Sequence, residues 1–172
     1  MRKNIVLIIF LVFSSSAWST PKSMVEREGY QESLKLLKRF GREEIIKNLV
    51  KVQRDQIDKF GGELDSYTNV VGIQGDDVGV TQTVILKVAE MLSDINPLLE
   101  SKGKDKLTKE SFSLFLYEGG YIYQQQVMML CSKPSTRALI DRNIVYSSKY
   151  YDNKMRYITE ISVDKSVCLK ND

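Results

Sequence analysis

The stretch VYSSKYYDNKMRYITEISV (residues 145–163) decides the fold of the second half of this chain. Aromatic, β-branched and small residues alternate from Ile144 to Tyr150, and a second alternating run extends from Met155 to Val163. Asp152-Asn153 separates the two runs. A period of two around such a pair is typical of a β-hairpin. We therefore expect two antiparallel strands that turn at Asp152-Asn153.

This hairpin is rich in tyrosine, and its two faces cannot both be buried by one helical layer. Tyr151 alternates opposite to Tyr146 and Tyr150, so at least one tyrosine should be exposed. The alternative for any single tyrosine is a place in the core. Exposed tyrosine offers a large contact area at low entropy cost, and basic side chains lie between these rings. The predicted partner contact consists of aromatic and basic residues: Tyr146, Lys149, Tyr151, Lys154, Arg156 and Tyr157.

An earlier alternating segment predicts a second hairpin. Residues 67–73 and 78–86 both have period two, and Gly75-Asp76-Asp77 lies between them. Glycine and aspartate are common turn residues, so Asp76 and Asp77 are interpreted as the hairpin turn.

The segment before this hairpin has a helical pattern. Tyr30, Leu34 and Leu37 recur at helical spacing, Gly41 interrupts the pattern, and apolar residues then follow a three-four rhythm over residues 46–60. Gly61-Gly62 closes the element. The pattern fits either two helices or one longer helix with a kink.

The connection between the hairpins is predicted to be helical. One helix begins near Ala89, residues 102–106 form a loop, and Thr108 caps a helix that ends near Cys131. Gly119-Gly120 interrupts this last helix, so residues 112–126 fit either a kinked helix or a short hairpin. We prefer the helix, because the following QQQVMMLC is rich in helix-forming residues.

Together these elements predict an α+β fold: N-terminal helices, two β-hairpins that form a four-stranded antiparallel sheet, a helix between the hairpins, and one disulfide. The helices are expected to cover one face of the sheet.

The first residues resemble a secretory signal. Arg2 and Lys3 precede an apolar run over residues 5–13, which is too short to span a bilayer. We expect a signal peptide over residues 1–19, with cleavage after Ser19 or alternatively after Ala17, and a single periplasmic domain over residues 20–172. No transmembrane segment should remain after cleavage. The expected destination is the bacterial periplasm or the medium.

Charge and cysteine content restrict the class of protein further. Removing Arg2 and Lys3 from the 25 basic residues leaves 23 against 22 acidic residues, a net charge of +1. No basic block remains for nucleic-acid binding. Cys131 and Cys168 are the two cysteines of the chain, and in an oxidising compartment they predict one disulfide rather than a catalytic dithiol, which usually has Cys-x-x-Cys spacing.

Catalytic constellations are scarce in this sequence. The chain has no histidine, which excludes Ser-His-Asp and Cys-His arrangements and the commonest zinc ligand sets. The adjacent pairs Asp76-Asp77 and Glu43-Glu44 diverge instead of converging on one bond. No calcium-loop or phosphate-binding glycine pattern is present. We therefore predict no catalytic residue, no metal site, no cofactor and no enzyme activity.

The segment CSKPSTRALIDRNIVYSSKYYDNK, which begins at Cys131, resembles the tail of small exported bacterial proteins of unassigned function. The likeness rests on Cys-x-x-Pro-x-x-Arg, a tyrosine-containing strand, an aspartate-containing turn and a closing cysteine, and it covers roughly the last quarter of the chain. It supports the hairpin and the disulfide, and it implies no activity.

Three functions fit these features. The first is a non-catalytic interaction protein of the bacterial envelope, such as an accessory factor of a secretion or surface assembly. The second is a periplasmic inhibitor or immunity protein against a toxin or a wall-degrading enzyme. The third is a carboxylate-dependent hydrolase. We expect a protein partner that contacts the C-terminal hairpin, and the alternative contact is a helix face that includes Leu36 and Val52.

Overall fold

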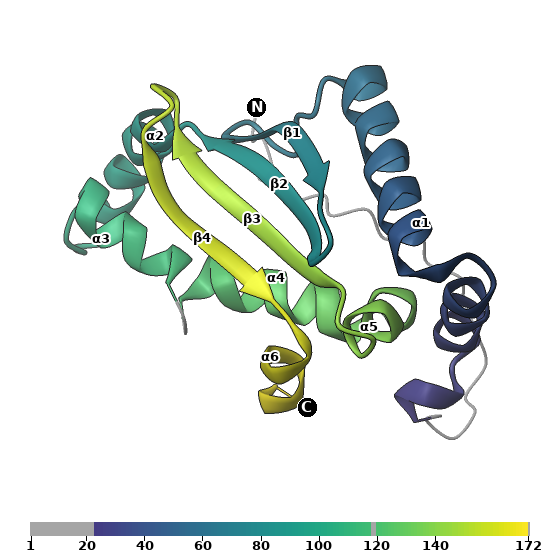
Figure 1. Cartoon of the computed structure of the whole chain (residues 1–172). Helices are drawn as coiled ribbons and strands as arrows, with labels where there is room; N and C mark the ends of the chain where they lie inside the picture. Colours follow the sequence, from purple (N-terminus) through teal and green to yellow (C-terminus); the bar gives the residue numbers. More distant parts are fainter. Residues whose placement is uncertain (1–22, 118–119, 172) are drawn as a thin grey trace.

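The structure is a computed structural model that describes residues 23–117 and 120–171 (Figure 1). The predicted signal peptide, residues 1–19, lies outside the described residues. In the described part of the chain, no helix has the length and apolar character that crossing a bilayer requires.

The N-terminal helical pattern forms one long helix with a kink. A short 3-10 helix, Met24–Glu26, precedes α1, which runs over Glu28–Phe60. Gly41 has φ 78° and ψ 169°, a backbone conformation that favours glycine and breaks the helical path at the predicted position. Gly61, with φ 77°, ends α1 and donates its N–H to the carbonyl of Ile57.

Both predicted hairpins are confirmed. Strands β1 (Thr68–Gly75) and β2 (Gly79–Leu86) are antiparallel and turn at residues 76–78. Strands β3 (Val145–Asp152) and β4 (Tyr157–Val163) form the C-terminal hairpin.

The connection between the hairpins is helical. The elements in chain order are α2 (Val88–Glu100), α3 (Lys109–Ser113), the 3-10 turn Leu114–Leu116, α4 (Tyr121–Ser132) and α5 (Pro134–Ile140). The helical alternative for residues 112–126 is therefore favoured in its described part, but two helices replace the single kinked helix. Helix α5, which begins at Pro134, is an element that the hydrophobic pattern did not predict.

The expectation of a purely antiparallel sheet is wrong. The strand order is β1-β2-β3-β4, and β2 pairs with β3 in parallel, with Gly79 opposite Val145 and Leu86 opposite Asp152. Parallel neighbours need a long crossover connection, and the helical segment from α2 to α5 supplies it. The alternating pattern within each strand does not indicate whether neighbouring strands of two hairpins run parallel or antiparallel.

The helices lie toward both edges of the sheet: α1 runs along the β1 side, and α2 and α3 lie beyond β4 (Figure 1). Alternate strand positions differ in burial. One set carries the buried side chains, which fall into two clusters. The larger cluster includes Val84, Tyr150 and Ile161, and the smaller joins Ile46 of α1 to Val80 of β2.

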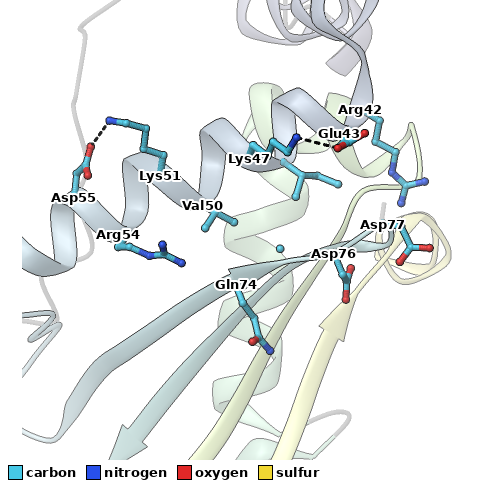
Figure 2. A pocket seen from close by; sticks show the side chains of 12 residues that line it. Arg42, Glu43, Lys47, Val50, Lys51, Arg54, Asp55, Gln74, Asp76 and Asp77 are labelled. Atoms are coloured by element: carbon cyan, nitrogen blue, oxygen red, sulfur yellow. Dashed lines mark hydrogen bonds and ion pairs between the residues drawn. The ribbon is translucent and has the colours of Figure 1, made fainter.

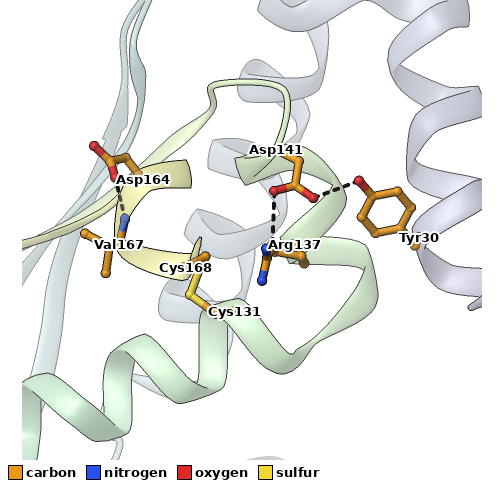
Figure 3. Close-up of polar contacts among 7 residues, drawn as sticks. All are labelled: Tyr30, Cys131, Arg137, Asp141, Asp164, Val167 and Cys168. Carbon is orange, nitrogen blue, oxygen red and sulfur yellow. Dashed lines mark hydrogen bonds and ion pairs between the residues drawn. A yellow bond between two sulfur atoms is a disulfide. The ribbon is translucent and has the colours of Figure 1, made fainter. Parts of the chain in front are cut away.

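Two links join helices that are distant in the sequence (Figure 3). Cys131 of α4 is bonded to Cys168 of the last helix, α6 (Lys165–Lys170). On the other side, the Tyr30 hydroxyl donates to Asp141 Oδ2 over 2.7 Å, and Arg137 Nε donates to Asp141 Oδ1 over 3.0 Å. The second network fixes the part of α1 before the Gly41 kink against α5.

Candidate functional site

The C-terminal hairpin separates its tyrosines by face, as the alternation predicts. Tyr150 is buried, and its hydroxyl donates to Gln126 Oε1 of α4 over 2.9 Å. Burial raises the pKa of Tyr150 to about 12. Tyr146 is half-buried and packs against both core clusters, and burial also raises its pKa to about 12. These two tyrosines therefore belong to the inner face of the sheet.

Gln126 links α4 to the middle of β3. Its Nε2 donates to the Ser148 hydroxyl over 2.8 Å, while its Oε1 accepts from Tyr150. Each polar group in this buried trio has a partner, so the trio stabilises the packing of α4 on the sheet instead of offering free groups for chemistry.

The opposite face of the hairpin carries an aromatic pair. The rings of Tyr151 and Tyr157 lie edge to face with centroids 5.7 Å apart, and Tyr157 is 59% exposed. Lys149 and Glu160 are opposite each other in the register of β3 and β4. A rigid aromatic pair beside charged side chains has the composition of a protein contact surface.

The turn of this hairpin is organised by one carboxylate. Asp152 accepts hydrogen bonds from the Arg156 guanidinium at 2.7 Å, from the Arg156 backbone N–H at 3.0 Å and from the Lys154 backbone N–H at 2.9 Å. These bonds, the Arg156 guanidinium first, lower the pKa of Asp152 to about 2. Arg156 is thereby held at the turn of the hairpin.

Five of the six predicted contact residues lie on one side of the hairpin or in its turn, and we call these five the hairpin surface: Lys149, Tyr151, Lys154, Arg156 and Tyr157. Tyr146 lies on the inner face, and we leave it out.

The structure adds exposed Met155 to this region, and β2 places Thr83 and Ile85 in register with Lys149 and Tyr151. The β2 residues could not be found from the sequence, because that required knowing that β2 and β3 are neighbours.

A second feature is a groove of about 950 Å³ between α1 and the β1–β2 turn (Figure 2). The α1 wall carries two ion pairs, Lys47 with Glu43 and Lys51 with Asp55, each at 2.9 Å. The opposite wall is the end of the hairpin, from Gln74 to Asp77.

Two of the carboxylates considered for catalysis, Glu43 and Asp76, have other roles in this groove. Asp76 Oδ1 accepts the backbone N–H groups of Val78 and Gly79, both at 2.8 Å, and these bonds lower its pKa. Asp76 is therefore a turn residue, as predicted. Within residues 23–117 and 120–171, no group of three or more His, Cys, Asp or Glu side chains is arranged to hold a metal ion.

No family model and no curated protein matches the chain. Solved structures that resemble it include a protein from Pseudomonas aeruginosa described as secreted, at 12% identity and TM-score 0.46, covering 83% of this chain and 97% of the other. The type II secretion system pilotin AspS of Vibrio cholerae has 12% identity and TM-score 0.41, covering 73% and 97%. The Vibrio vulnificus pilotin EpsS has 12% identity and TM-score 0.45, covering 74% and 97%. At these TM-scores the likeness carries no functional argument.

Proposed function

We propose that this protein is a non-catalytic accessory factor of the bacterial cell envelope that binds a protein partner through the hairpin surface. The observation that supports the proposal is the Tyr151–Tyr157 pair, which lies on the face of the hairpin away from the buried tyrosines. The ring contact between Tyr151 and Tyr157 and the Asp152 bonds at the turn already order this end of the hairpin in the free protein, so part of the ordering cost of binding is met. The pilotin likeness is not part of this support.

The polar groups of the site fit binding better than catalysis. Asp152 and Asp76 are each engaged by backbone N–H groups of their own turns, which favours the ionised form of both carboxylates. A general acid needs a raised carboxyl pKa, and the pKa of both groups is lowered instead. The proposal therefore assigns the hairpin surface to contact and no residue to chemistry.

Site-specific photo-crosslinking in living cells tests this function. A photoreactive amino acid at Tyr157 should trap one defined envelope protein, and the same group at Leu36, which is exposed on α1, should not trap it. An assembly component supports the accessory role, whereas a toxin or wall-degrading enzyme supports the inhibitor alternative. Trapping of the same protein from Leu36 but not from Tyr157 would reject the hairpin surface.

A further inference from the structure

The edge strand β1 is only partly covered. At its beginning, the chain that leaves α1 folds back along it: the Val70 N–H donates to the Gly62 carbonyl over 2.9 Å, and the Leu64 N–H donates to the Thr68 carbonyl over 3.0 Å. A β-bulge follows between Val70 and Gly72. Residues 62–64 thus already occupy the place of an outer strand along the first half of β1.

The second half of β1 faces the groove. Arg54 of α1 donates a guanidinium N–H to the Ile73 carbonyl over 3.2 Å. Along an edge strand, the backbone N–H and C=O groups of every second residue point away from the paired strand. In β1 the groups of Ile73 and Gly75 therefore point away from β2. Among the described residues, no hydrogen bond from outside the hairpin reaches the backbone of Gly75. The Arg54 side chain occupies the position that the N–H of a further strand would take.

The groove has the dimensions of a short extended segment. Its α1 wall extends from Arg42 to Asp55 and includes Glu43 and Arg54, which are eleven positions apart. At about 1.5 Å per helical residue this is roughly 16 Å, the length of about five residues of β-strand. The methyl groups of Ile46 and Val50 would lie 2.6 and 2.9 Å from a Cβ at Gly75, so the helix is packed closely against the base of the groove.

Charges differ between the two ends of the groove. The ion pairs Lys47–Glu43 and Lys51–Asp55 neutralise the middle of the α1 wall. At the hairpin end Asp76 and Asp77 lie near Arg42, which donates to the Val78 and Asn143 carbonyls, so one acidic charge is in excess there. Arg54 lies toward the other end (Figure 2). An occupant with one basic and one acidic residue, separated along an extended backbone, matches this arrangement.

We propose that the groove between α1 and β1 binds an extended segment of a partner protein, which pairs with the edge of β1 at Gly75, replaces the Arg54 guanidinium at the Ile73 carbonyl, carries a basic side chain near Asp76 and Asp77, and carries an acidic side chain that pairs with the released Arg54. This interface is separate from the hairpin surface and does not depend on it.

The test is an NMR titration of the mature protein with a synthetic five-residue peptide, acetyl-Lys-Val-Thr-Val-Glu-amide, at millimolar concentration. The amide signals of Ile73 and Gly75 should shift, and those of the hairpin surface should not. A peptide with the same side chains and N-methyl groups on alternate backbone nitrogens should lose binding, because it cannot donate to the strand edge.

Charge reversal supplies matched variants. Asp77→Lys and Arg54→Glu should each weaken binding of the peptide by roughly threefold to tenfold, because each places like charges together. Glu32→Lys reverses an exposed charge on α1 before the Gly41 kink, outside the groove lining, and should leave binding unchanged.

Three results would overturn the proposal: no shift at Ile73 and Gly75, equal binding of the N-methylated peptide, or signals at the edge of β1 that change with protein concentration alone. The last result would assign the groove to a second copy of this chain. The titration reports on β1 alone, so a negative result would reject the groove proposal without bearing on the hairpin surface.

Discussion

Tyr150 and Tyr151 are neighbours in the chain and have opposite environments. Tyr150 is 7% exposed and bonded to Gln126, whereas Tyr151 contacts Tyr157 on the outer face. A shift of one residue in a strand exchanges the two faces, so the position of each tyrosine in β3 fixes its role.

The first prediction compares the two hydroxyl groups. Tyr150→Phe should lower the free energy of unfolding by about 1–3 kcal/mol, because it leaves the buried Gln126 Oε1 without its donor. Tyr151→Phe is the matched control and should change it by less than about 0.5 kcal/mol. Urea denaturation measures both. Equal effects of the two changes would contradict the assignment of faces.

The second prediction concerns the turn carboxylate. Asp152 should titrate near a pKa of about 2 in the folded protein, and Arg156→Ala should raise that pKa toward the ordinary value. Because the folded pKa lies below the unfolded one, the contribution of Asp152 to stability is present above about pH 4 and is lost as the pH falls toward 2. Carboxyl NMR signals report the titration, and an unchanged pKa in Arg156→Ala would show that Arg156 is not its cause.

At the scale of the elements, the parallel pairing of β2 and β3 is the feature that the sequence did not indicate. Gly79 is the first residue of β2 and pairs with Val145, the first residue of β3. A Cβ at Gly79 would be 1.9 Å from the Val145 carbonyl oxygen. Gly72, on β1, has room for a Cβ, since the nearest atom is 3.7 Å away.

The third prediction follows from this difference. Gly79→Ala should lower the free energy of unfolding by about 2 kcal/mol or more, because the backbone of β3 must move. Gly72→Ala should cost much less. Thermal denaturation followed by circular dichroism distinguishes them, and a neutral Gly79→Ala would argue against the pairing of Gly79 with Val145.

The fourth prediction tests the link between α4 and α6. Cys168→Ala should lower the free energy of unfolding by about 2–5 kcal/mol, the range for native disulfides in exported domains. Free-thiol labelling of the denatured, non-reduced wild-type protein should find no reactive cysteine. Two labelled cysteines in that sample would contradict the bond.

Much of the element order could be predicted because it depends on local pattern. Glycine at positions 41 and 61 marked the kink and the end of α1, and Asp152 marked the second turn. Helix α5 was missed because its seven residues are too short for a periodic pattern, although Pro134 at its first turn was a signal.

At the scale of the whole molecule, the order of the strands and the positions of the helices depend on long-range packing that no local pattern contains. Five of the six predicted contact residues do lie on one side of the C-terminal hairpin or in its turn, because the alternation of a strand is a local pattern. Tyr146 was wrongly included, since it alternates in step with the buried Tyr150. The groove at β1 was not foreseen, since it requires α1 and the first hairpin to be placed together.

The central claim is that the Tyr151–Tyr157 pair of the hairpin surface binds a protein partner and contributes little to the stability of the fold. The most direct test measures the affinity of the crosslinked partner for the Tyr151→Ala/Tyr157→Ala variant by calorimetry. We expect binding to weaken by about 1–3 kcal/mol for each aromatic contact, while the melting temperature stays close to that of the wild type. The Leu36→Ala/Val52→Ala variant, on the exposed side of α1, should bind normally. Full affinity of a folded Tyr151→Ala/Tyr157→Ala variant, or loss of affinity in the α1 variant alone, would contradict the claim.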